Sequence, residues 1–155
     1  MIVRFFKTGI SRGEAPINYL LGNTNHEGVQ RSEAPVVLEG IPELTVDLIN
    51  GIQRKFKYSS GCLAFRPDEQ PTREELHNIL GKFKSVVAPS LSADSINSLF
   101  VLHHDPPDKK TGLAGFHIHF ILPMVRVFRM LLESTGRHSA QGFAVRSPSM
   151  QNATY

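Results

Sequence analysis

The sequence predicts an α+β domain in which helices pack on a mainly antiparallel central sheet. Two observations lead to this prediction. Segments with strand and helix patterns follow one another in the order β-α-β-α-β-α-β-β, without an internal repeat. The last two strand segments are joined by a loop short enough for a hairpin, which makes these strands adjacent and antiparallel. A chain of 155 residues is long enough for one domain with a sizeable core.

The first part of the chain supplies two strands and two helices. The β-branched and aromatic stretch "IVRFF" (2–6) predicts a strand. "APINYLLG" (15–22) predicts a short helix, because a proline stands in its first turn and a glycine at its end. "PVVLEG" (35–40) predicts a second strand. From 42 to 56, leucine and isoleucine recur at helical spacing and Phe56 extends the apolar stripe, so we expect a second helix there.

The remaining elements have stronger signals. "SGCLAF" (60–65) predicts a strand. The next helix should begin after Thr72, because Glu75 completes a capping box with it. "SLFVLHH" (98–104) and "GFHIHFILP" (115–123) predict the two strands of the hairpin, on either side of a loop with two prolines.

Composition limits the class of protein. Hydrophobic residues make up 41% and charged residues 20%, as in ordinary soluble domains, and no apolar run is long enough to span a membrane. The N-terminus is too short and polar for a signal peptide, and the single cysteine excludes an intrachain disulfide, so we expect a cytoplasmic protein. Residues 1–123 carry 13 Lys/Arg and 13 Asp/Glu, which leaves the net charge of +3 to the four Arg and one Glu of residues 124–155. Net charge therefore gives the body of the chain little support for nucleic-acid binding.

Three histidines form the strongest candidate site. Strand alternation places His117 and His119 on one face, about 7 Å apart along the strand. The same alternation in the preceding strand allows His103 to lie beside them. Three imidazoles on one sheet face can hold a divalent metal and leave coordination positions open. Asp105 is suited to orient a ligand histidine, although it could equally be a turn residue before the prolines.

The residues alone do not identify a nucleophile. Cys62 lies within a hydrophobic strand, where a cysteine usually serves packing. Tyr19 lies in a short helix, and on sequence alone we expect a half-buried packing residue.

Taken together, these motifs resemble the relaxases of small mobilisable plasmids of the colicin-plasmid type, within the HUH endonuclease group. The resemblance runs from Met1 to about Val125 and includes the opening "MIVRFFKTGISRGEAPINYLLG", "KYSSGCLAF" and "VLHHDPPDKKTGLAGFHIHFILP". Many colicin-type relatives have Glu and Asn where this chain has His117 and His119. The segment between the position of His103 and this pair is also shorter in those relatives.

The resemblance implies an HUH/relaxase-like fold and a DNA relaxase, which nicks one strand at a plasmid transfer origin for conjugative mobilisation. Tyr19 would be the nucleophile, and His103, His117 and His119 would bind Mg²⁺ or Mn²⁺. The general base is left open between two candidates, Asp105 and a metal-bound water. The implied partners are single-stranded DNA at the origin and accessory mobilisation proteins.

The resemblance divides the chain into a relaxase-like catalytic domain at 1–125, incomplete at its C-terminal end, and a divergent, disordered basic tail at 126–155. This division leaves alternatives open. A rolling-circle replication initiator would share the metal site and the tyrosine. A histidine-triad hydrolase would need a third alternate histidine where Ile121 stands. A truncated fragment would bind metal or DNA without turnover.

Overall fold

A computed structural model of the chain describes residues 1–7, 9–25, 27–92, 95–107, 112 and 114–125. The segment 126–155, for which we predicted a basic tail, lies outside the described residues. The elements are β1 (Ile2–Phe5), α1 (Glu14–Leu21), β2 (Val36–Glu39), α2 (Pro42–Gly51), β3 (Tyr58–Ala64), α3 (Arg73–Val87), β4 (Leu99–His104) and β5 (Phe116–Pro123). Their order is the predicted one.

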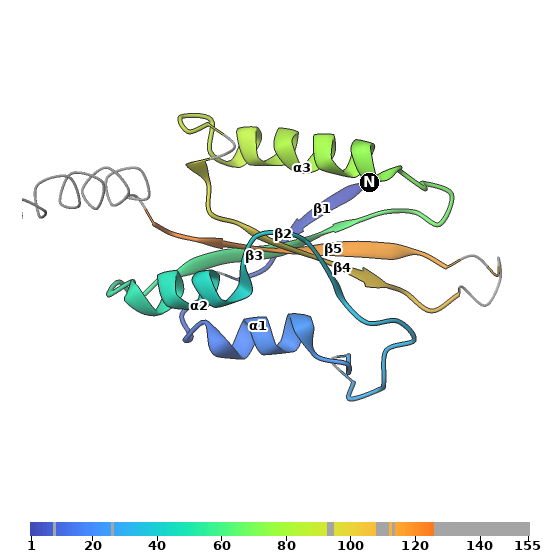
Figure 1. Cartoon of the computed structure of the whole chain (residues 1–155), viewed down its shortest axis with the longest axis horizontal. Helices are drawn as coiled ribbons and strands as arrows, with labels where there is room; N and C mark the ends of the chain where they lie inside the picture. Colours follow the sequence, from blue (N-terminus) through green and yellow to red (C-terminus); the bar gives the residue numbers. More distant parts are fainter. Residues whose placement is uncertain (8, 26, 93–94, 108–111, 113, 126–155) are drawn as a thin grey trace, which may run out of the picture.

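The five strands form one sheet in the order β1-β3-β5-β4-β2, and every pair of neighbours is antiparallel. The predicted hairpin is confirmed, because β4 and β5 pair over six residues of each strand. With three helices on this sheet, the described chain has the predicted α+β fold (Figure 1). No helix within the described ranges is long and apolar enough to cross a membrane.

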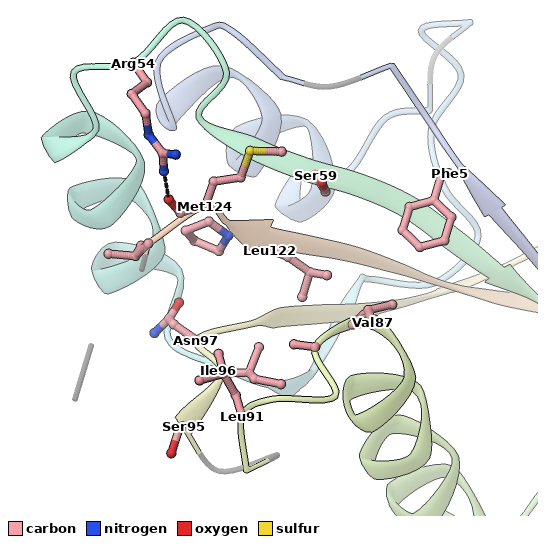
Figure 2. Close-up of a pocket in the computed structure, with 13 residues that line it drawn as sticks. Phe5, Arg54, Ser59, Val87, Leu91, Ser95, Ile96, Asn97, Leu122 and Met124 are labelled. Carbon is pink, nitrogen blue, oxygen red and sulfur yellow. Dashed lines mark hydrogen bonds between the residues drawn. The ribbon is translucent and has the colours of Figure 1, made fainter. Parts of the chain in front are cut away.

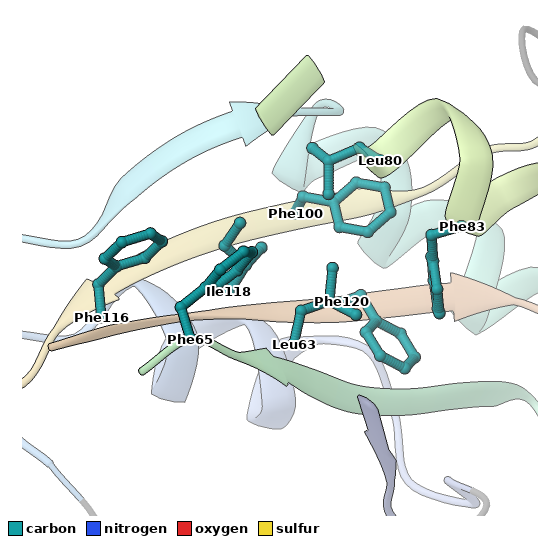
Figure 3. Packing of buried hydrophobic residues seen from close by; sticks show 8 residues of the cluster. All are labelled: Leu63, Phe65, Leu80, Phe83, Phe100, Phe116, Ile118 and Phe120. Atoms are coloured by element: carbon teal, nitrogen blue, oxygen red, sulfur yellow. The ribbon is translucent and has the colours of Figure 1, made fainter. Parts of the chain in front are cut away.

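The helices lie on opposite faces of the sheet. In Figure 1, α3 covers one face and α1 and α2 cover the other. Figure 3 shows the core beneath α3, which is rich in phenylalanine and includes Leu80, Phe83, Phe100, Ile118 and Phe120. A second cluster, containing Ile17, Leu20, Ile49, Leu99, Val101 and Ile121, lies beneath α1 and α2. Alternation along β4 and β5 therefore separates two packed faces, as the sequence predicted.

The second helix is shorter than the sequence predicted. It ends at Gly51, and Ile52 adopts an extended conformation while its side chain remains buried. The chain then turns toward β3, where the backbone N–H of Lys57 donates to the carbonyl of Gly9. Phe56, which we predicted to extend the apolar stripe of this helix, is instead 52% exposed.

The third helix begins as predicted. The Thr72 hydroxyl accepts a hydrogen bond from the backbone N–H of Glu75, and the Glu75 carboxylate accepts one from the backbone N–H of Thr72. This reciprocal pair satisfies two donors at the helix end.

A cavity of about 540 Å³ opens on the α3 face at the end of β5 (Figure 2). Leu122 and Val87 line it, and Arg54 closes one side by donating a hydrogen bond to the carbonyl of Met124. The histidines lie on the opposite face of the sheet, so this cavity is separate from the candidate site.

Candidate active site

The sheet register brings the three predicted histidines together. His103 of β4 pairs with His117 of β5, and His119 lies two residues further along β5. One ring nitrogen of each histidine lies within 4.8 Å of those of the other two. Because β5 is the central strand, the cluster sits in the middle of the sheet, on the face that α1 covers.

His117 is oriented by the carboxylate that the sequence singled out. Its Nδ1 lies 2.9 Å from Oδ1 of Asp105. The hydrogen bond from His117 is the main reason that the pKa of Asp105 lies below its usual value, so the carboxylate is ionised at neutral pH. An ionised carboxylate can only accept, so Nδ1 of His117 carries a hydrogen. In a neutral ring, Nε2 then presents a lone pair, and it lies 3.1 Å from Nε2 of His119.

His103 is fixed by helix α1. It is 2% exposed, and its Nε2 donates to the backbone carbonyl of Leu20 at 2.8 Å, because a carbonyl oxygen can only accept. In the neutral ring Nδ1 is left as an acceptor. This atom is buried and has no hydrogen-bond partner among the described residues. A buried polar atom without a partner is costly, so its lone pair is available for a ligand.

The surroundings keep two of the rings neutral. Burial, ahead of the neighbouring charges, lowers the pKa of His103 to about 4 and that of His119 to about 3. Imidazole binds metal only in its neutral form. Three clustered imidazoles, one with an unpartnered buried lone pair and one held by a carboxylate, are a donor set that fits a divalent cation.

Helix α1 places Tyr19 beside this cluster. Ile17 and Leu20 are buried against the sheet, whereas Tyr19 is 41% exposed and meets the ring of His119 edge-on, with ring centroids 6.4 Å apart. Tyr19 is thus more exposed than the packing role that we expected from the sequence alone. A cavity of about 160 Å³ lies next to it, with Phe6, Tyr58 and His119 among its lining residues.

Contacts between the two helices fix the start of α1. The Asn50 side chain accepts a hydrogen bond from the backbone N–H of Gly13 and donates one to Glu14. A Cβ at Gly13 would lie 2.8 Å from the backbone of Val46, so a glycine permits the two helices to approach this closely.

Arg31 also reaches the site, and we did not single it out from the sequence. It lies in the polar loop between α1 and β2, and its guanidinium stands over the Tyr19 ring, with Cζ 5.8 Å from the centroid. No periodicity or motif marks an arginine in such a loop, so only the fold shows where it lies.

Cys62 of β3 lies opposite His119 in the register. Its thiol is partly buried, and burial raises its pKa. A protonated, packed thiol is consistent with the packing role expected from the sequence.

Comparisons with known proteins test the resemblance directly. The cryptic plasmid protein C of Neisseria gonorrhoeae is 34% identical over 127 residues, which are 82% of this chain and 56% of that protein. The DNA relaxase MbeA of Escherichia coli is 35% identical over 125 residues, which are 79% of this chain and 21% of that protein. This chain thus spans about half of the first relative and about a fifth of the second. No family model matches it, and no solved structure does.

Each alignment is about as long as the part of the chain to which the resemblance was assigned, and the α+β fold is consistent with that assignment. The resemblance stated from the motifs is therefore confirmed at the level of sequence. Over about four fifths of its length the chain is similar in sequence to these two proteins, one of which is a DNA relaxase.

Proposed function

We propose that this chain is a metal-dependent DNA relaxase, which nicks and rejoins one DNA strand at a plasmid transfer origin. The observation that supports it most is the position of Tyr19. A tyrosine ring lies against one of three clustered histidines, and nothing in the local sequence around Tyr19 requires that contact. Phosphoryl transfer through a tyrosine needs a phenol next to side chains that can bind a metal, and here those side chains are the three imidazoles.

The reaction is a transesterification. The Tyr19 oxygen attacks the scissile phosphorus, the bond to the 3′ oxygen breaks, and the DNA 5′ phosphate is joined to the tyrosine. The phenolic proton passes to a general base, and the departing 3′ oxygen takes up a proton. The phosphodiester is conserved throughout, so attack by the 3′ hydroxyl on the phosphotyrosine reverses the step.

A bound divalent cation would polarise the scissile phosphate and favour the phenoxide, whose parent phenol has a pKa near 10 in water. We assign its ligands as His103, His117 and His119, and we assign to Asp105 the task of keeping the hydrogen on Nδ1 of His117. The cation is Mn²⁺ or Mg²⁺ on the strength of the resemblance. Imidazole donors suit Mn²⁺ better than Mg²⁺, so we expect tighter binding of Mn²⁺.

The same proposal covers the partners and the location. The substrate is single-stranded DNA at the origin, accessory mobilisation proteins assist, and the reaction takes place in the cytoplasm. One alternative is a protein that binds metal or DNA without turnover. A rolling-circle replication initiator would share the chemistry, but the early position of Tyr19 in the chain argues against it.

Formation of a covalent protein–DNA adduct tests the proposal. The full chain is incubated with Mn²⁺ and a single-stranded oligonucleotide that spans the transfer-origin nick site, and the products are resolved on a denaturing gel. Wild type should form an adduct, and Tyr19→Phe, which lacks one oxygen, should form none while still binding the oligonucleotide.

Tyr58→Phe is the matched control. Tyr58 is 7% exposed and its hydroxyl is hydrogen-bonded to Ser11, so its loss should leave the adduct intact. An adduct with Tyr19→Phe would assign the nucleophile elsewhere. No adduct with wild type, although metal and DNA bind, would favour the non-catalytic alternative.

A further inference from the structure

Two hydrogen bonds position Arg31 above Tyr19, the nucleophile assigned to this site. Its backbone N–H donates to the carbonyl of Asn23 at 2.7 Å, and its Nε donates to the carbonyl of Gly22 at 3.1 Å. These two bonds tie the arginine to the end of α1, directly after the turn that carries Tyr19. The guanidinium is therefore fixed relative to the tyrosine rather than extended into solvent.

One end of the guanidinium is buried without a partner. Its Nη2 atom is inaccessible to solvent and makes no hydrogen bond within the described part of the chain. A buried charged donor without an acceptor is costly, because neither water nor protein satisfies it. The fork of an arginine matches the oxygens of a phosphate, which makes a phosphate oxygen a fitting acceptor.

The charges around Arg31 also favour an anion. Among the described residues no carboxylate forms an ion pair with Arg31, and the acidic group at the cluster, Asp105, is engaged by His117. The positive charge reaches the cluster, since it contributes, after burial, to the lowered pKa of both His103 and His119. With the imidazoles neutral, the charges of Arg31 and Asp105 balance, and a bound divalent cation would make the site positive.

We propose that Arg31 is a further catalytic residue, whose guanidinium donates a hydrogen bond to a non-bridging oxygen of the phosphate that Tyr19 attacks. This inference rests on the proposed function. It assigns a recognition element for the scissile phosphate to the protein itself, independent of metal. In the transition state the same contact would stabilise the added negative charge on that oxygen.

Binding measured without metal separates this role from a structural one. The full chain is titrated with two oligonucleotides across the nick site, one native and one with an uncharged methylphosphonate at the scissile position. A charge-assisted hydrogen bond predicts that wild type binds the native strand on the order of 10-fold more tightly. Arg31→Gln should reduce this preference to less than about 3-fold, and Arg31→Lys should restore part of it.

Arg12→Gln is the control, because Arg12 is exposed and paired with Glu14 at the start of α1. It should keep the full preference. In the adduct assay with Mn²⁺, Arg31→Gln should slow formation by about 10²- to 10³-fold, as expected when one donor to a developing charge is lost. Melting temperatures of all variants are recorded, because Arg31 also supports the loop through Gly22.

Three outcomes are distinct. If wild type forms the adduct and Arg31→Gln keeps the full preference for the charged strand, Arg31 only supports the loop and the inference is wrong. If Arg31→Gln unfolds, the inference depends on Arg31→Lys, and it is wrong if that folded variant shows no change in preference or rate. If wild type forms no adduct and shows no preference, the proposed function fails, and the assignment to Arg31 with it.

Discussion

The contact between Asp105 and His117 gives a sharp prediction about metal affinity. Replacing Asp105 with Asn keeps the shape of the side chain and removes its charge. Oδ1 of Asp105 now lies 2.9 Å from Nδ1 of His117 and fixes the hydrogen on that nitrogen. An amide can still accept this hydrogen bond, but it no longer favours the tautomer electrostatically and no longer raises the basicity of the ring.

The size of the effect follows from the surroundings. Loss of a partner that orients a metal ligand typically weakens metal affinity by about 10- to 100-fold, or about 1.4 to 2.7 kcal/mol. The side chain of Asp105 is 44% exposed, so water screens part of its charge. We therefore expect the lower end of the range, about a 10-fold increase in the dissociation constant for Mn²⁺.

Calorimetry with Mn²⁺ at neutral pH measures this change. Asp68→Asn is a suitable control, because Asp68 is 68% exposed and pairs only with Arg66 within the described part of the chain. That variant should bind Mn²⁺ as wild type does. Equal affinities for Asp105→Asn and wild type would refute the orienting role, and no binding by wild type would refute the metal centre itself.

Two further predictions concern stability. In the metal-free protein the pKa of His103 is about 4 and that of His119 about 3, below their usual value of 6.5, so the unfolded chain takes up protons that the folded chain does not. The free energy of unfolding should therefore be constant above pH 6.5 and fall as the pH drops toward 4. Urea titrations should give a lower free energy of unfolding at pH 5 than at pH 7.5, and the difference should be smaller for His119→Gln. A Cβ at Gly61 would lie 2.2 Å from the backbone of β1, so Gly61→Ala should lower the melting temperature by several degrees. Gly81→Ala is the control, because Gly81 lies inside α3 and nothing lies within 4 Å of the added Cβ. This variant should raise the melting temperature slightly. Equal shifts in melting temperature for both variants would contradict the close packing of β3 against β1.

The sequence by itself determined the features that depend on near neighbours. Alternation along 115–123 placed His117 and His119 on one face, because successive strand residues point to opposite sides. The capping box at Thr72 set the start of α3 through contacts three residues apart. The short loop before β5 made the last two strands a hairpin, which was enough to bring His103 beside His117.

Only the tertiary structure decided what surrounds the histidines. Tyr19 approaches His119 because Ile17 and Leu20 are buried against the sheet, across about 100 residues of sequence. The orphaned Nδ1 of His103 exists because the Leu20 carbonyl occupies its other nitrogen. Arg31 stands over the tyrosine because its loop folds back on the end of α1. These contacts arise from packing between segments far apart in the chain, and such packing leaves no periodic signal in the sequence.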